Sequence, residues 1–280
     1  MILITTAGKV GSEASRLLAR QGISVRLIVH DPQKASALAQ SGVEVYAGDL
    51  GDPASIDAAM RDISSVILVS PPIADLELNV IASAVRGGVG HVVKITSKAS
   101  ADSPIARRRD QTRIEEGLIA SGLGHTLLRN NGYMQNFLML APQIATTNSF
   151  GSSAGSGRIG MIDARDVATV AAEIAATPAH HAGRTYWPTG SELLTYSDTA
   201  AILSNVLGRP ITFHSLTFEQ EKQAMIGAGL PESLADMNAQ AMNLIAQGDS
   251  DWITDDVPAI LGRPARTFEA FATDHAAAFN

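Results

Sequence analysis

The feature that most constrains the fold is a regular alternation, over residues 1–130, between short apolar runs and longer segments with helical periodicity. Runs rich in Val, Ile and Leu are typical of strands that are buried on both faces, as in parallel sheets. The runs are Ile2–Ile4, Val25–Val29, Val43–Tyr46, Val66–Val69, Val92–Ile95 and Thr126–Leu128. Helical segments between them, such as the one with Val10, Ala14 and Leu18 on one face, would form the crossovers. The pattern therefore predicts an α/β fold with a doubly wound parallel sheet.

The rhythm changes after Asn130, where the regular spacing of the apolar runs ends. Ile159–Ile162 predicts a further strand, and the helix that follows would run through Ala176. We expect these last elements to return to the first domain. The predicted domains are residues 1–130 plus about 159–188, and a smaller helix-rich domain of residues 131–158 and 189–280.

Two local signals stand out in the smaller domain. Thr195, with Asp198 three residues later, is typical of a capping box at the start of a helix over Tyr196–Leu207. Gly151–Gly157 is rich in glycine and serine, which indicates a mobile loop or lid. The domain is expected to cover the carboxyl edge of the sheet, where open α/β sheets bind ligands.

Composition narrows the classes of function. The chain has 280 residues, no cysteine and a formal net charge of −7. The lack of cysteine excludes disulfides, thiol catalysis and thiolate metal sites, and the negative charge argues against a nucleic-acid partner. The apolar runs are far shorter than the roughly 20 residues of a membrane-spanning helix. We expect a cytoplasmic monomer or homodimer that acts on a small-molecule substrate and has no nucleic-acid or membrane partner.

The turn after the first predicted strand reads Thr5-Thr6-Ala7-Gly8-Lys9-Val10-Gly11. Dinucleotide-binding domains have a glycine-rich turn here, where Gly8 would admit a pyrophosphate and Gly11 would let the helix pack closely. The first N–H groups of the helix would bind the phosphates. Thr5 stands where the first glycine of the motif is expected, so we expect this turn to depart from the standard one. The motif favours dinucleotide binding over a purely structural turn.

The end of the second predicted strand bears on the choice between NAD and NADP. Asp31 has the spacing of an acid that binds the ribose hydroxyls of NAD, but Asp31 followed by Pro32 is also typical of a helix cap. We favour the cap. His30 and Lys34, with Lys9 nearby, would then receive a 2′-phosphate, which favours NADP(H) and leaves NAD(H) open.

Several segments along the whole chain resemble the NmrA-like family of atypical short-chain dehydrogenases. They include ILITTAGKVGSEASRLLARQG, GVEVYAGDLGDPASIDAAM, VILVSPP, GVGHVVKITS, SGLGHTLLRNNGYMQNF, GRIGMIDARDVATVAA and GRTYWPTG. The resemblance implies a Rossmann-type NADP-binding domain with a small C-terminal substrate domain. It also implies an oxidoreductase, because the family includes NADPH-dependent quinone and triphenylmethane reductases, although it also includes redox-sensing regulators without activity.

The resemblance assigns roles to individual positions. Those implied to bind the cofactor are Thr6, Gly8, Lys9, Val10, Gly11, His30, Lys34, Asp49, Leu50, Ser70, Pro71, Pro72, Thr96, Ser97 and Lys98. Those implied to line the substrate pocket are Asn131, Tyr133, Gln135 and Asn136. His30 stands where many relatives have an arginine for the 2′-phosphate, and Asn130 replaces a proline of the family pattern.

The resemblance also reveals a missing pair. Standard short-chain dehydrogenases use a Tyr-x-x-x-Lys pair, but the corresponding segment Ile105–Ser121 contains neither tyrosine nor lysine. Hydride transfer would then need an electrophile that requires little acid help, such as a quinone or a conjugated aromatic cation. Tyr133 is the candidate catalytic residue, either as a proton donor or as a substrate contact, and a plain pocket-lining role stays open.

The predicted function is an NADPH-dependent oxidoreductase that passes hydride to a small, quinone-like or conjugated aromatic substrate. Two alternatives stay open: an NAD(P)-binding redox-sensing regulator without turnover, and a non-redox lyase or isomerase on the same fold. The arginine run Arg107–Arg109 is interpreted as a solvated first turn of a helix. His180 and His181 lie in a predicted turn without a third ligand nearby, so no metal site is predicted.

Overall fold

The computed structural model describes residues 1–71 and 73–280. The chain divides into two compact units. The first consists of Met1–Ser103, Arg107–Asn130 and Ala164–Trp187, and the second of Pro104–Ala106, Asn131–Asp163 and Pro188–Asn280. The sequence predicted that the chain returns to the first domain at about residue 159. In the structure the returning segment begins at Ala164, five residues later, and ends at Trp187.

The first unit is built on a seven-stranded sheet in which every neighbouring pair is parallel. The strands are β1 (Ile2–Ile4), β2 (Val25–Val29), β3 (Glu44–Ala47), β4 (Ser65–Leu68), β5 (His91–Thr96), β6 (Gly124–Arg129) and β8 (Arg184–Tyr186). Their order is β3-β2-β1-β4-β5-β6-β8. The predicted doubly wound parallel sheet is confirmed, and the order reverses between β1 and β4, which is where such sheets bind ligands.

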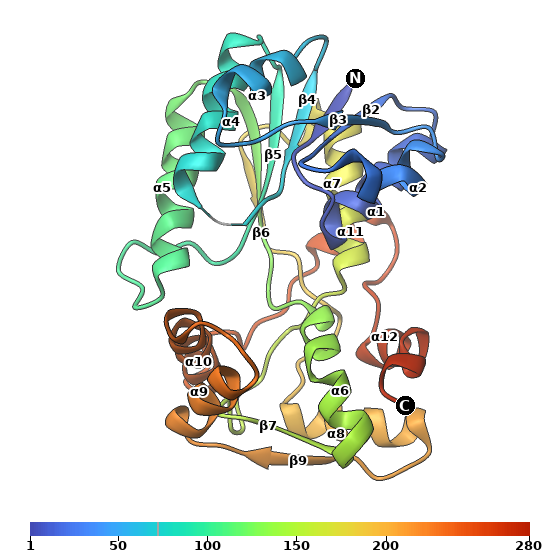
Figure 1. Cartoon of the computed structure of the whole chain (residues 1–280), viewed down its shortest axis with the longest axis vertical. Coiled ribbons are helices and arrows are strands. Elements are labelled where there is room, and N and C mark those ends of the chain that lie inside the picture. Colours follow the sequence, from blue (N-terminus) through green and yellow to red (C-terminus); the bar gives the residue numbers. More distant parts are fainter. Residues whose placement is uncertain (72) are drawn as a thin grey trace. The chain divides into compact units, whose positions relative to one another are not determined.

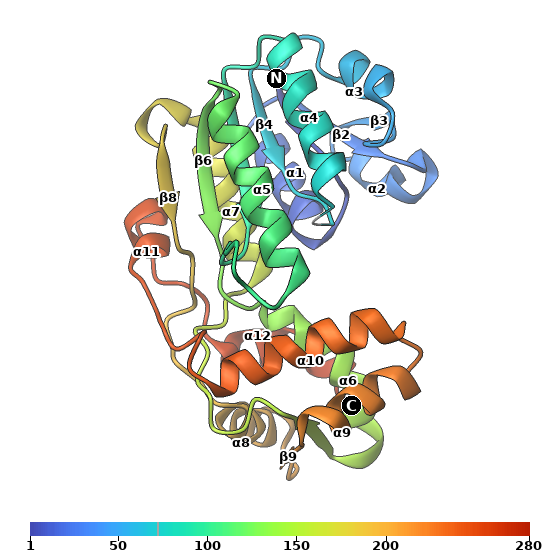
Figure 2. The ribbon, with the colours of Figure 1, turned by 90° about the vertical axis from the view of Figure 1, so that its left-hand side faces the viewer.

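Helices cover both faces of this sheet (Figure 1). They are α1 (Lys9–Arg20), α2 (Ser36–Ala39), α3 (Pro53–Ala59), α4 (Ala74–Arg86), α5 (Ala106–Ala120) and α7 (Ala164–Ala176), with short 3-10 turns η1 (Pro32–Ala35) and η3 (Pro178–His180). Figure 2 shows α4 and α5 in front of the sheet and α7 behind it. α1 and α7 pack against each other although about 150 residues separate them along the chain.

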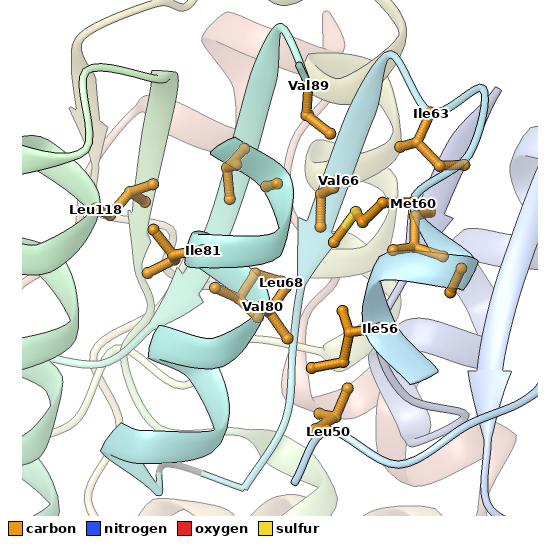
Figure 3. Close-up of a cluster of buried hydrophobic side chains, with 14 of the residues drawn as sticks. Leu50, Ile56, Met60, Ile63, Val66, Leu68, Val80, Ile81, Val89 and Leu118 are labelled. Carbon is orange, nitrogen blue, oxygen red and sulfur yellow. The ribbon is translucent and has the colours of Figure 1, made fainter. Parts of the chain in front are cut away.

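A hydrophobic cluster of the first unit lies between the sheet and α3, α4 and α5 (Figure 3). Val66 and Leu68 of β4 are fully buried beneath Ile56 of α3 and Val80 of α4. Leu118 brings α5 into the same cluster. Most of the apolar runs of the sequence therefore correspond to strands covered on both faces, as expected for crossover helices that alternate between the two sides. The exception is β3, at the edge of the sheet, whose residues are exposed or half-buried.

The second unit is mostly helical and contains a two-stranded parallel sheet. Its elements are η2 (Met134–Asn136), α6 (Phe137–Thr147), β7 (Ser149–Ser152), α8 (Tyr196–Leu207), β9 (Thr212–Ser215), α9 (Phe218–Gly227), α10 (Glu232–Ala246), α11 (Asp256–Leu261), α12 (Phe268–Asp274) and η4 (Ala276–Ala278). Aromatic rings hold its core together: Phe137 lies 4.8 Å from Phe268 and 5.5 Å from Tyr196, measured between ring centroids.

The predicted capping box is confirmed. The Thr195 hydroxyl accepts a hydrogen bond from the backbone N–H of Asp198 at 3.0 Å, and the Asp198 carboxylate accepts one from the Thr195 N–H at 2.9 Å. These reciprocal bonds satisfy two donors that the first turn leaves without intrahelical partners. α8 accordingly begins at Tyr196.

Two predictions for the second unit are wrong. Ile159–Ile162 forms two isolated bridges, Ile159 with Leu194 and Ile162 with Tyr133, because its two ends meet different segments. Gly151–Gly157 is not a loop along its whole length, because it comprises the end of β7 and a turn with buried residues. The carboxylate of Glu221, on α9, fixes that turn by accepting from the Ser153 N–H at 2.8 Å and the Ser152 hydroxyl at 3.1 Å.

His91 makes the stability of the first unit depend on pH. Burial, together with the charges of His125 and His181, lowers the pKa of His91 to about 4, and its Nε2 lies 2.9 Å from the Thr126 hydroxyl. Between pH 6.5 and 4 the unfolded chain binds a proton at His91 that the folded chain does not. The free energy of unfolding therefore decreases as the pH is lowered from 6.5 to 4, by about 3 kcal/mol in total.

Urea denaturation of the wild type and of His91→Gln at pH 7.5 and pH 5 tests this. From pH 7.5 to pH 5, the free energy of unfolding of the wild type should fall by about 2 kcal/mol more than that of the variant. Equal losses in both proteins would contradict the assignment.

Candidate functional site

The first β–α turn is tied to the neighbouring strand by two threonine hydroxyls. The Thr5 and Thr6 hydroxyls both donate to the Val69 carbonyl at 2.7 Å, and the Val69 N–H donates back to the Thr5 hydroxyl at 2.9 Å. Among the described residues, the non-glycine residues with positive φ are Asp62 and Asn148, so Thr5 keeps an ordinary backbone. The turn departs from the glycine-rich standard by anchoring its first residue through the side chain.

Gly8 and Gly11 differ in what surrounds them. A Cβ on Gly11 would lie 1.9 Å from the Thr6 carbonyl oxygen, so only glycine fits where α1 meets the turn. A Cβ on Gly8 would meet no atom closer than the Thr6 hydroxyl at 3.8 Å. Gly8 is the exposed N-cap of α1, and within the described part of the chain no side-chain hydrogen bond caps it. This helix start has the geometry and the dipole that favour an anion.

The end of β2 carries exposed basic groups and an acid that is already engaged. Asp31 accepts a hydrogen bond from the Gln33 N–H at 3.0 Å, which confirms the predicted cap. His30 and Lys34 are exposed beside it, and the Lys34 ammonium lies 4.0 Å from the Asp31 carboxylate. Lys9, at the start of α1, is also exposed.

The two candidates after β3 differ in exposure. Asp49 is exposed, and its carboxylate accepts from the Gly51 N–H at 2.7 Å, which fixes the turn into α3. Leu50 is buried in the hydrophobic cluster beneath α3 and α4. The Leu50 side chain is therefore part of the hydrophobic core, and its role in cofactor binding stays a prediction.

The residues after β4 lead to an ion pair that the sequence analysis missed. The hydroxyl of the half-buried Ser70 donates to the Glu77 carboxylate of α4 at 2.6 Å, and the Lys94 ammonium of β5 lies 2.6 Å from the other oxygen of that carboxylate. Pro71 is exposed, and Pro72 lies outside the described residues. A lysine within the apolar run of β5 was the available signal, because an isolated ammonium is costly to bury.

The ends of β5 and β6 face two polar side chains of α5. The Thr96 hydroxyl donates to the Gln111 side-chain oxygen at 2.8 Å, and Glu115, one turn further, pairs with Arg129 at the end of β6. The Arg129 guanidinium also stacks over the Trp187 ring at 5.1 Å. Gln111 and Glu115 thus occupy the buried face of α5 where the sheet ends, and both were missed by sequence reasoning.

Ser97 and Lys98 follow Thr96 and are half-buried. With Thr6, Gly8, His30, Asp49 and Ser70 they come directly after strands of one parallel sheet. The topology therefore places the described cofactor candidates at the carboxyl edge of the first unit, as the sequence predicted.

The candidates for the substrate pocket belong to the second unit. The Asn131 side chain donates to the carbonyls of Ser250 at 3.1 Å and Trp252 at 3.3 Å, and the Gln135 side chain donates to Asp163 at 2.8 Å. Tyr133 is half-buried and Asn136 is exposed. The amides of Asn131 and Gln135 therefore hold this segment in place, and their role toward a substrate stays a prediction.

The histidine pair and the arginine run of the sequence make local contacts in the structure. The His181 imidazole lies 2.9 Å from the Tyr186 hydroxyl, and Arg109 donates to the Ser103 carbonyl at 2.5 Å. Within residues 1–71 and 73–280, no group of three or more His, Asp or Glu side chains is arranged to hold a metal ion. No helix in that part of the chain is long and apolar enough to cross a membrane.

The parallel sheet, its glycine-dependent first turn and the basic groups after β2 define a dinucleotide-binding class of fold. The model of the NmrA-like family matches residues 1–272, and this chain belongs to that family.

Named relatives match along most or all of the chain. It is 38% identical to an NAD(P)H azoreductase of Xenophilus azovorans over 287 aligned positions, covering 100% of this chain and 99% of that protein. It is 33% identical to quinone oxidoreductase 2 of Escherichia coli (strain K12), with 86% of each chain covered.

Solved structures agree with these relatives. An NADPH-dependent quinone oxidoreductase of Escherichia coli in complex with NADPH has a TM-score of 0.89 and 30% identity, with 100% of both chains covered. The triphenylmethane reductase of a Citrobacter species in complex with NADP(H) has a TM-score of 0.87 and 27% identity, covering 99% of this chain and 100% of that one.

Gly11 should contribute to the stability of the fold, whereas Gly8 should contribute little. Gly11→Ala places a methyl group against a backbone carbonyl that cannot move without breaking the turn, so the free energy of unfolding should fall by about 1–3 kcal/mol. Gly8→Ala is the matched control and should cost less than about 1 kcal/mol. Urea denaturation of the three proteins measures both effects. A loss for Gly8→Ala as large as that for Gly11→Ala would contradict the packing described here.

Proposed function

We propose that this protein is an NADPH-dependent oxidoreductase that reduces a small electrophilic compound, such as a quinone or a conjugated azo or cationic aromatic. The observation that carries the proposal is the uncapped N-terminus of α1 at Gly8, located at the point where the strand order reverses. The named relatives support the same chemistry, since their descriptions are an NAD(P)H azoreductase, an NADPH-dependent quinone oxidoreductase and a triphenylmethane reductase in complex with NADP(H).

The residues present fit a dinucleotide. Gly8 has no side chain in the way of a pyrophosphate, and the first N–H groups of α1 are oriented to donate to it. Ser70 and Thr96 would line the nucleoside that extends over β4 and β5. When bound, the reduced nicotinamide supplies the hydride. The task of the chain is to orient both partners and to exclude water around them.

The groups after β2 favour NADPH over NADH. The Asp31 carboxylate is engaged as a helix cap, so it is not directed to the ribose hydroxyls that an NAD-selective acid would bind. His30, Lys34 and Lys9 are exposed cations or potential cations on the same side. They would attract the two negative charges of a 2′-phosphate, although none has the planar fork of an arginine.

Proton supply is the step that differs most from standard short-chain dehydrogenases. α5 carries Gln111 and Glu115 on its buried face and has no tyrosine or lysine in its sequence. The Glu115 carboxylate is already paired with Arg129 and does not replace the missing tyrosine. Substrates that accept hydride with little acid assistance therefore suit this site, and Tyr133 is the candidate donor where a proton is needed.

The missing Tyr-x-x-x-Lys pair also favours a second candidate. A protein that binds NADP(H) without turnover and responds to its redox state would need the same fold and none of the acid chemistry. The two functions differ in turnover, so one assay separates them.

Purified protein mixed with NADPH and a panel of quinones and azo dyes tests the proposal, with loss of NADPH absorbance as the readout. We expect turnover above the enzyme-free rate with at least one acceptor, and slower turnover with NADH. No turnover, combined with strong binding preference for one redox state of NADP, would support the regulator instead. Failure to bind either dinucleotide would overturn both functions.

Tyr133→Phe tests the proton donor. If the hydroxyl protonates the reduced substrate, kcat should fall by about 10²-fold or more, whereas KM for NADPH stays unchanged. Tyr186→Phe, in the first unit, is the control for loss of a tyrosine hydroxyl. Wild-type kcat in Tyr133→Phe would assign this ring to packing or to substrate contact.

A further inference from the structure

Lys94 and Glu77 form an ion pair deep inside the first unit. Both side chains are fully buried, and the Lys94 Nζ lies 2.6 Å from the Glu77 Oε2. The same ammonium donates to the Ile95 carbonyl at 2.7 Å. Lys94 is in the middle of β5, hydrogen-bonded between β4 and β6, and Glu77 is in the first turn of α4.

Stability alone does not account for this pair. Burial raises the pKa of Glu77 and lowers the pKa of Lys94, and the attraction between the two charges opposes both shifts. Replacing a buried ion pair by apolar side chains of similar size is often neutral or stabilising. Leu68 lies beside Lys94 on the neighbouring strand and Val80 follows Glu77 by three residues in α4, so apolar side chains already pack in this region. The role of the ion pair must therefore lie in its effect on neighbouring residues.

The pair fixes the direction of one hydroxyl at the edge of the sheet. The Ser70 Oγ lies 2.6 Å from the Glu77 Oε1 and 3.2 Å from the Pro71 carbonyl oxygen. A hydroxyl has a single hydrogen, and the shorter contact to a charged acceptor takes it. The lone pairs of the Ser70 oxygen are then left to face away from Glu77. Ser70 is thus set as a hydrogen-bond acceptor at this edge.

Ser70 follows the residue that anchors the phosphate-binding turn. Val69 holds the Thr5 and Thr6 hydroxyls, so Ser70 adjoins the turn that carries Gly8. A dinucleotide lies across the point where the strand order reverses, with one nucleoside on each side. The side toward β2 carries His30 and Lys34, which suit the phosphorylated ribose. The side toward β4 and β5 would receive the ribose of the nicotinamide, whose hydroxyls are hydrogen-bond donors.

We propose that Lys94 and Glu77 are positioning residues that hold Ser70 as the acceptor for a hydroxyl of the nicotinamide ribose. The inference rests on the proposed binding of NADPH and adds which residues orient its reactive half. The Lys94 ammonium favours the ionised form of Glu77, Glu77 takes the Ser70 hydrogen, and the Ser70 oxygen receives the ribose hydroxyl.

The test compares NADPH with adenosine 2′,5′-bisphosphate, which lacks the nicotinamide ribose. The variants are Ser70→Ala and the paired change Lys94→Met with Glu77→Leu, which removes both charges together. We expect each variant to bind NADPH about 3- to 10-fold more weakly, the loss of one hydrogen bond, and to bind the bisphosphate as the wild type does. Adding Ser70→Ala to the paired change should cost nothing further, because both act through one hydroxyl.

The matched control is the exposed ion pair of Arg86 and Asp57, which joins the other end of α4 to α3. Arg86→Gln with Asp57→Asn should leave the affinity for both probes unchanged. Should the paired core variant not fold, Lys94→Met with Glu77→Met repeats the test with side chains of similar length and no unpaired charge, and the same selective loss for NADPH is expected.

Two results would overturn the inference. One is wild-type affinity for NADPH in a folded variant without the ion pair, and the other is an equal loss for NADPH and the bisphosphate. Either result leaves the proposed function standing as long as the wild type binds NADPH. Failure of the wild type to bind NADPH would instead overturn the proposed function itself.

Discussion

The close approach of α1 to the turn before it is the constraint on which the candidate site depends. A Cβ at Gly11 would collide with the Thr6 carbonyl, so the helix can start where it does only with glycine there. The Thr5 and Thr6 hydroxyls then fasten the turn to Val69, at the end of β4. The helix start, the turn and the edge of β4 are consequently held together, so the proposed anion-binding position at Gly8 is set before any ligand arrives.

Much of the fold could be predicted from sequence because the relevant signals are local. Apolar runs identify β1, β2, β4 and β5, which are buried on both faces, and the Thr195–Asp198 capping box fixes the start of α8. Elements without such signals were missed. β8 is an edge strand with two exposed residues, and α6 contains Pro142 within its apolar stretch. Ile159–Ile162 has the composition of a strand, but its partners are decided by distant segments.

The same distinction applies to the candidate site: the positions of its residues could be predicted from the sequence, but their contacts could not. That His30, Asp49, Ser70 and Thr96 lie at one edge follows from parallel topology, which the sequence predicts. Which partner each side chain selects does not follow. Asn131 bonds to a carbonyl 119 residues away, and the Lys94–Glu77 pair joins a strand to a helix that precedes it. Such contacts depend on the packed structure, so sequence reasoning could mark Lys94 as unusual without identifying Glu77 or Ser70.

The central claim is that the open start of α1 at Gly8 binds the pyrophosphate of NADPH. Calorimetric titration of NADPH into the wild type and into Gly8→Val tests it most directly, because a side chain at Gly8 has room in the folded chain and would occupy the phosphate position. We predict that both proteins fold and that the variant loses more than about tenfold in affinity, a cost of roughly 1.4 kcal/mol. Equal affinity of the two folded proteins for NADPH would contradict the account.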